Sequence, residues 1–205
     1  MGCLVGLVKK IIIIALIIAF FIFGGWELTK QKINDYKNPP RDEFIQTESD
    51  YGDFSGVSSD YQLTRSFNIF GYKKINAKYL PTGQKITIFD LKDETKLCEN
   101  DFETKEIDEK INNILGGLKD SFITYENFQI TKRGKYYPKN KTIPYIVYKA
   151  NVKNIPFKTV VGVVAVYSTQ NKKAKHPSTK LIISTTDKKA YNYTVMNGFV
   201  SALKF

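Results

Sequence analysis

The chain has very little of the chemistry on which most enzymes depend. Its 205 residues include one histidine, His176, and two cysteines, Cys3 and Cys98. A folded domain that holds a single cysteine cannot contain a disulfide framework. Nucleophilic catalysis needs a nucleophile, a base and an orienting group, and a lone histidine in the polar stretch NKKAKHPSTK does not supply them. Cys98 is surrounded by acidic residues, which disfavour the thiolate, so we interpret it as structural.

The motifs of the common enzyme and cofactor classes are also missing. The sequence contains no G-x-S-x-G, no H-E-x-x-H, no P-loop and no glycine-rich dinucleotide turn. The acidic stretches DLKDE and CENDFE lack the glycine and the regular alternation of a calcium loop. We therefore expect no cofactor, no metal and no enzymatic activity. The alternative is a hydrolase that acts on envelope material, with the acidic residues 93–103 as general acids or bases.

Acidic residues are scarce in the C-terminal half of the chain. Residues 111–205 carry 16 basic and 3 acidic side chains, whereas residues 41–110 carry 10 basic and 15 acidic ones. Basic residues concentrate in KRGKYYPKNK, around Tyr136 and Tyr137, and in NKKAKH. The cluster consists of Lys132, Arg133, Lys135, Lys139, Lys141, Lys172, Lys173 and Lys175.

Two interpretations of this basic cluster stay open. Loops of a β-meander alternate between the two ends of the sheet, so both basic loops are expected at one end, close to the acidic start of a preceding helix. The charges then neutralise each other within the domain, with a small gain for each exposed pair. Alternatively, the cluster contacts an anionic partner such as lipid headgroups, a wall polymer or an acidic protein. Nucleic acid is not expected, because it requires a cytoplasmic domain.

A long apolar run occupies the N-terminus, MGCLVGLVKKIIIIALIIAFFIFGGW. Residues 11–26 carry no charge and would span about 24 Å as a helix, against about 30 Å for a bilayer core. The run is apolar on every side and has no polar face for solvent, so we exclude the core of a soluble domain. We predict an uncleaved single-pass signal-anchor, and the alternative is a cleaved signal peptide, although no A-x-A-like site follows. The expected anchor residues are Ile11, Ile14, Leu16, Phe20, Phe23 and Trp26.

The remaining chain divides into a tether and a folded domain. We assign residues 1–37 to the anchor and its helical extension, which ends at Asn38-Pro39-Pro40 because proline cannot continue a helix. Residues 38–66 are polar and are predicted to form a flexible linker. Residues 67–205 are predicted to form the domain. The side of the membrane on which this domain lies is inferred from Lys9 and Lys10, which precede the span and favour a domain outside the cytoplasm. Lysines after the span weaken this inference.

Hydrophobic periodicity predicts an α+β domain. INAKYL and QKITIFD flank Pro81-Thr82-Gly83, the pattern of a β-hairpin. Apolar residues from Ile107 to Phe122 recur with helical spacing, and so do those from Tyr191 to Leu203. Between them lie four predicted strands, 127–133, 143–152, 157–168 and 180–186. The third is apolar on both faces, so we expect it at the centre of a mainly antiparallel sheet between two helical layers.

This order of elements, together with the ending KLIISTTDKKAYNYTVMNGFVSALKF, resembles the PsbP-like α/β/α sandwich family. The resemblance covers about residues 67–205. It implies a three-layer sandwich and a binding or assembly role, as in extrinsic thylakoid-lumen photosystem proteins and secreted or membrane-attached bacterial relatives. No family binding motif is present to carry over. We therefore predict a membrane-anchored, non-enzymatic binding module of a bacterial envelope, which presents an α/β domain at the membrane surface and contacts an anionic partner through its basic hairpin loops.

Overall fold

The protein is seen in a computed structural model, which describes residues 25–66, 74–91, 99–104, 106–117, 125–138, 141–152, 159–169, 178–186 and 191–204. The chain divides into two compact units, Met1–Pro39 and Pro40–Phe205. The first unit contributes one described helix, and the second contains all of the described strands. Each unit is described by itself below.

Helix α2, Gly25–Lys37, is the described part of the first unit. Its sequence GWELTKQKINDYK is polar, and Lys30 forms an ion pair of 2.9 Å with Glu27. Most of the predicted span, including Ile11, Ile14, Leu16, Phe20 and Phe23, lies outside the described residues, and Trp26 belongs to α2. Among the described residues, no helix is long and apolar enough to cross a membrane. The prediction of a single-pass transmembrane signal-anchor is corrected accordingly, because α2 carries charged residues along its length.

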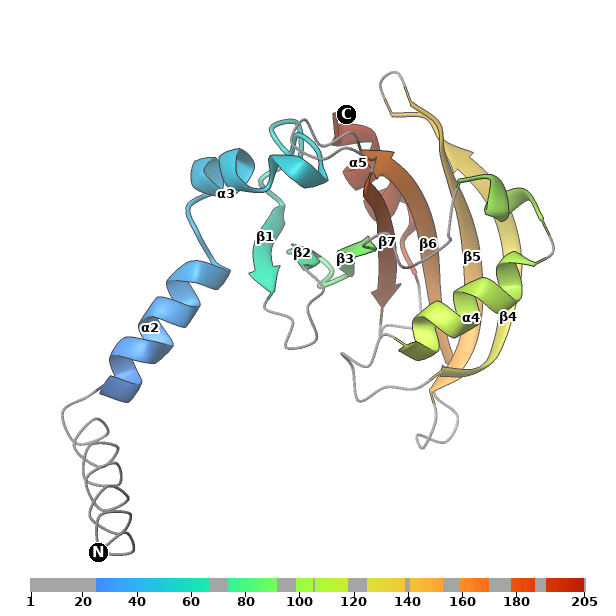
Figure 1. Cartoon of the computed structure of the whole chain (residues 1–205), viewed down its shortest axis with the longest axis horizontal. Helices are drawn as coiled ribbons and strands as arrows, with labels where there is room; N and C mark the ends of the chain where they lie inside the picture. The colour runs from blue at the N-terminus through green and yellow to red at the C-terminus, as the bar shows by residue number, and fades with distance from the viewer. Residues whose placement is uncertain are drawn as a thin grey trace, which may run out of the picture. The chain divides into compact units, whose positions relative to one another are not determined.

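The second unit is built on one antiparallel sheet of seven strands in the order β1-β2-β3-β7-β6-β5-β4 (Figure 1). The strands are β1 Tyr61–Ser66, β2 Lys74–Tyr79, β3 Lys85–Leu91, β4 Tyr125–Tyr136, β5 Ile143–Val152, β6 Thr159–Thr169 and β7 Ser178–Thr186. Strands β1 to β3 form one meander and β4 to β7 form another. The two meanders join where β3 pairs with β7, so β1 and β4 are the edges.

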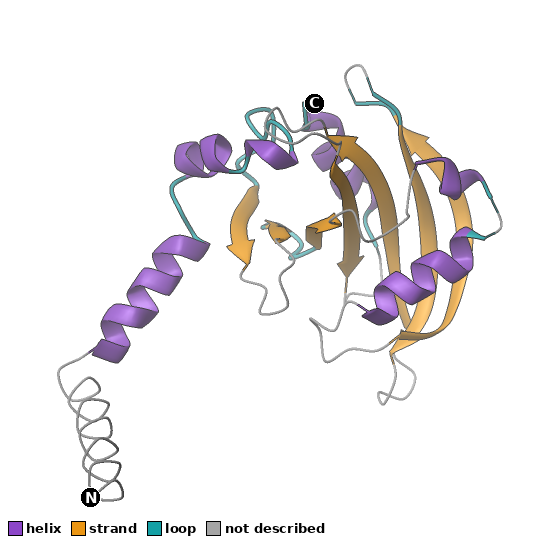
Figure 2. Ribbon diagram, viewed as in Figure 1, coloured by secondary structure: helices purple, strands orange, loops and turns teal. Residues whose placement is uncertain are grey.

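The helical segments of this unit are short (Figure 2). They are α3 Arg41–Thr47, η1 Ser49–Tyr51, η2 Glu99–Glu103, α4 Ile107–Gly117 and α5 Tyr193–Ala202. The predicted fold class, a transmembrane helix plus a three-layer α/β/α sandwich, is therefore wrong. Seven strands extend over about 29 Å across the sheet, whereas an eleven-residue helix is about 16 Å long, so single short helices cannot form complete layers.

Two hydrophobic clusters lie on opposite faces of the sheet. On one face, Phe102, Ile107 and Ile111 of η2 and α4 pack against strand residues such as Ile146 and Val164. On the other face, α5 and the α3–η1 segment pack against residues such as Val147 and Val163. Strand β6 alternates between the two clusters, which confirms that its residues are buried on both sides.

The sequence predicted a flexible linker over residues 38–66, but the part of this segment from Pro40 onward is folded. It forms α3, η1 and β1, and it buries the apolar residues Phe44, Tyr51, Phe54, Val57, Tyr61 and Leu63. The Phe54 ring lies 5.5 Å from that of Phe44 and 6.4 Å from that of Phe199 in α5. Widely spaced aromatic residues thus anchor a polar segment to the sheet, because each one buries a large area on its own.

Candidate functional site

The basic residues of strand β4 are divided between the two faces of the sheet. Lys132 is paired with Val147 of β5, and Arg133 is paired with Ile146. Since directly opposed residues share a face, Lys132 lies on the α5 side and Arg133 on the α4 side. The register shifts between Ile130 and Lys132, so this assignment depends on an irregularity in the strand.

On the α4 side, the basic and acidic segments pair with each other. Arg133 forms an ion pair of 3.2 Å with Asp108, and Lys135 forms one of 2.7 Å with Glu103. The Lys135 ammonium lowers the pKa of Glu103, chiefly through this hydrogen bond, and Glu103 raises the pKa of Lys135 in return. Arg133 also donates to the backbone oxygens of Phe102 and Thr104, each at 2.9 Å. These two basic side chains therefore fasten β4 to η2 and α4.

The other predicted contact residues do not join a single patch in the described part of the chain. The Lys141 ammonium donates to the Ser168 carbonyl and lies 5.6 Å from the Tyr167 ring centroid. Partial burial lowers the pKa of Lys141, an effect that the nearby Glu99 opposes. Lys139, Lys172, Lys173 and Lys175 lie outside the described residues. Among the described residues that were predicted to contact an anionic partner, Lys132 therefore lies in surroundings that differ from those of Arg133, Lys135 and Lys141.

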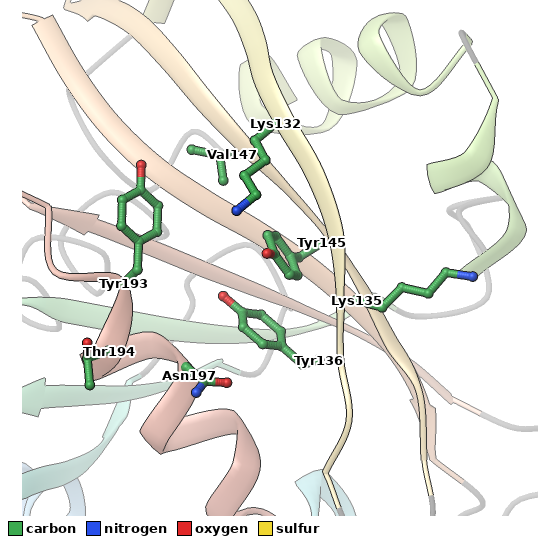
Figure 3. A pocket seen from close by; sticks show the side chains of 8 residues that line it. All are labelled: Lys132, Lys135, Tyr136, Tyr145, Val147, Tyr193, Thr194 and Asn197. Carbon is green, nitrogen blue, oxygen red and sulfur yellow. The ribbon is translucent and has the colours of Figure 1, made fainter.

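Lys132 borders a pocket of about 460 Å³ between the β4–β5 pair and the first turn of α5 (Figure 3). The lining residues are Lys132, Lys135, Tyr136, Tyr145, Val147, Tyr193, Thr194 and Asn197. Figure 3 shows the Lys132 ammonium and the hydroxyls of Tyr136 and Tyr145 directed toward the same space, whereas the Lys135 side chain points away. Lys132 forms no ion pair with any residue that the structure describes.

Two tyrosines on neighbouring strands form one wall of the pocket. The rings of Tyr136 and Tyr145 are stacked, with centroids 4.3 Å apart and planes 25° apart. Gly134, which is paired with Tyr145, makes room for that ring, because a Cβ atom there would lie 2.5 Å from the Tyr145 Cζ. Tyr136 is 7% exposed, and burial raises its pKa well above the ordinary value, so its hydroxyl stays protonated.

The opposite wall is the N-terminus of α5, which polar contacts hold against the sheet. The Asn192 side chain caps the helix by accepting from the Thr194 N–H at 2.9 Å. Gln84, which is buried, donates to the Asn192 carbonyl and accepts from its N–H, both at 3.1 Å. Tyr191 and Tyr193 form an edge-on pair with centroids 4.9 Å apart. The first turn of the helix is thereby fixed beside Lys132.

The described residues that line the pocket are rich in hydrogen-bond donors and include no carboxylate. Every lining residue except Val147 carries an N–H or O–H group, and the helix N-terminus adds a partial positive charge. Such surroundings favour a bound anion over a cation. The arrangement is suited to holding a carboxylate or phosphate group, with Lys132 supplying the full charge.

The acidic residues that were candidates for hydrolysis form ion pairs or hydrogen bonds within the protein where the structure describes them. Asp101 pairs with Lys110 at 2.6 Å, Glu103 pairs with Lys135, and Glu99 accepts from the Ser168 N–H at 3.2 Å. Asp93, Glu94, Cys98 and His176 lie outside the described residues. Within the described ranges, no group of three or more His, Cys, Asp or Glu side chains is arranged to hold a metal ion. These contacts join the acidic segment to α4, β4 and β6.

Sequence reasoning found Lys132 but missed most of its neighbours. Tyr145, Tyr193, Thr194 and Asn197 come from separate segments, and no local motif connects them. The available signal was limited to tyrosines at alternating strand positions and a polar first turn in the C-terminal helix.

Comparisons with known proteins identified no relative of this chain. No family model matches this chain, and searches of the curated proteins and of the solved structures returned no match either. The resemblance to the PsbP-like family therefore stays a prediction.

Proposed function

We propose that this chain is a non-enzymatic binding module that recognises an anionic group in the pocket between β4, β5 and α5. The observation that supports this proposal is the position of Lys132, an ammonium group without a described ion-pair partner. The described residues that line the pocket around it are mostly hydrogen-bond donors and include no carboxylate. The anionic partners expected from the sequence all carry phosphate or carboxylate groups.

The contrast with Arg133 and Lys135 supports a binding role for Lys132. Those two side chains are neutralised by Asp108 and Glu103 on the other face of the same strand. Among the described residues Lys132 has no such neighbour, so we infer that its charge is available to a ligand. Hydrogen bonds to charged groups contribute about 1.5–3 kcal/mol each, which is enough for a single lysine to determine affinity for a small anion.

The first test is the substitution Lys132→Met, which removes the charge and keeps the length of an exposed side chain. Inorganic phosphate is titrated into the full chain at low salt, and binding is followed through amide shifts in two-dimensional NMR. We expect saturable shifts at Tyr193, Thr194 and Asn197 in the wild type. The affinity for phosphate should be at least about tenfold lower in the variant. Added salt should weaken binding in the wild type, because it screens an exposed charge.

The matched control is Lys78→Met, which makes the same change at an exposed position in β2, outside the pocket lining. This variant should bind phosphate as the wild type does. Equal affinity in the Lys132→Met variant and the wild type, or shifts that avoid the first turn of α5, would contradict the proposal.

A further inference from the structure

We propose that the pocket selects an anionic group that is attached to a planar aromatic ring, with the ring held between Tyr193 and Tyr145. This inference rests on the proposed function and names the class of ligand. It concerns a small aryl phosphate or aryl carboxylate. Its basis is the shape of the pocket and the arrangement of its tyrosines.

The size of the pocket exceeds what an isolated anion needs. Pockets for small organic ligands have volumes of about 300–1,000 Å³, and the volume here is about 460 Å³. A phosphate or carboxylate beside Lys132 would fill only part of this space. The remaining space is bordered mainly by tyrosine rings, so an added ring would be in contact with protein on several sides.

Two tyrosine walls face each other across the pocket. Figure 3 shows Tyr193 on one side and the stacked pair of Tyr136 and Tyr145 on the other, with Lys132 reaching in between. The stack and Gly134 hold the Tyr145 ring in place from behind. Tyr193 is 50% exposed, so its ring has free surface for a ligand. Two aromatic walls favour a flat ring, since aromatic pairs prefer offset-stacked or edge-to-face contacts.

The Tyr136 hydroxyl points to the position proposed for the anionic group. Tyr136 is more than nine-tenths buried and lines the pocket, and Figure 3 shows its hydroxyl directed into the same space as the Lys132 ammonium. A ligand oxygen in that space would accept a hydrogen bond from this hydroxyl. Because burial also keeps the phenol protonated, Tyr136 can act with Lys132 as a donor.

The lining also argues against a lipid tail as the occupant. Of the lining residues that the structure describes, Val147 is the only aliphatic one, and the other side chains end in a polar group. An acyl chain would leave those groups without partners. A ring with an attached anion uses both the flat faces of the tyrosines and the polar ends around them.

The test compares three probes on the full chain by isothermal titration calorimetry: phenyl phosphate, cyclohexyl phosphate and inorganic phosphate. We expect phenyl phosphate to bind about tenfold more tightly than either of the others, because only its ring can stack on tyrosine. Tyr193→Leu should remove this preference, so that phenyl phosphate and inorganic phosphate bind to the variant with similar affinities. Tyr137→Leu, which alters a tyrosine that is 73% exposed and outside the pocket lining, should change neither affinity.

The outcomes separate this inference from the proposed function. Equal, Lys132-dependent binding of all three probes would overturn the ring preference and retain the anion site. Binding of none of them would overturn both. A preference for phenyl phosphate that survives both Tyr193→Leu and Tyr145→Leu would also overturn the inference, because the ring would then lie elsewhere.

Discussion

At the scale of single residues, the pocket depends on a glycine that makes room for an aromatic ring. Gly134 lies opposite Tyr145, and the end of that ring occupies the space in which a Cβ would stand. The same arrangement recurs in the core, where Gly162 is paired with Tyr148. A glycine in a strand normally weakens it, so these two glycines are explained by the rings beside them.

Replacing Gly134 by alanine tests this contact. The new Cβ would lie 2.5 Å from the Tyr145 Cζ and hydroxyl, so the ring must move, and we expect a loss of about 1–3 kcal/mol in unfolding free energy. In a Tyr145→Ala background the loss should vanish. Urea denaturation of both variants measures the difference. Gly198→Ala is the control, because its nearest neighbour is 3.5 Å away, and a gain of about 0.5–1 kcal/mol is expected there. A loss that persists without Tyr145 would refute the contact.

At the scale of elements, residues 40–60 behave as a strap across one face of the sheet. Phe44, Tyr51 and Phe54 are each at most 2% exposed, and the Tyr167 hydroxyl donates to the Tyr51 carbonyl at 2.6 Å. Beneath this strap, the buried Lys180 pairs with Asp90 at 2.8 Å and lies 4.5 Å from the Tyr51 ring centroid. The strap thus covers the buried ion pair that links β7 to β3.

The substitution Phe54→Ala distinguishes a strap from a flexible linker. Phe54 is fully buried between Phe44 and Phe199, so truncation should lower the unfolding free energy by about 3–5 kcal/mol. The measurement is chemical denaturation of the full chain. Tyr137→Ala removes an aromatic ring that is 73% exposed and should change stability by less than about 0.5 kcal/mol. A Phe54 variant as stable as this control would show that the segment does not contribute to the core.

At the scale of the whole molecule, buried tyrosines make the folded state sensitive to alkaline pH. Burial raises the pKa of Tyr61 to about 12, and it also raises the pKa values of Tyr136, Tyr167 and Tyr191. In the unfolded chain these groups ionise near pH 10. Above that pH the unfolded state releases protons that the folded state retains, so ionisation favours unfolding.

We therefore expect full stability below about pH 10 and a progressive loss between about pH 10 and 12. Tyrosine absorbance should show these buried tyrosines ionising only as the protein unfolds. Tyr61→Phe removes a hydrogen bond of 2.6 Å to the Val195 carbonyl, which costs about 1 kcal/mol at neutral pH. The variant should lose less stability between pH 10 and 12 than the wild type. An unfolding free energy that rises between pH 10 and 12 would contradict the raised pKa values of the buried tyrosines.

Local sequence patterns were sufficient for most of the strands and for the positions of the two longest helices of the second unit. Strand β6 has apolar residues on both faces, and β2 and β3 flank a turn in which Gly83 has a φ of 74°. Both features depend on residues that are close in the chain. The prediction of a flexible linker was wrong because the packing of this segment depends on residues that are far apart in the chain. Phe44, Phe54 and Phe199 become neighbours only in the folded state.

The sequence by itself determined which segments form strands, because alternation and turn residues act over a few positions. Only the tertiary structure decided which residues make a site. The register shift in β4 places Lys132 toward α5 and Arg133 toward α4, and the pairing of β3 with β7 brings Gln84 to the start of α5. These outcomes depend on contacts between distant segments, whose free energies no local pattern records.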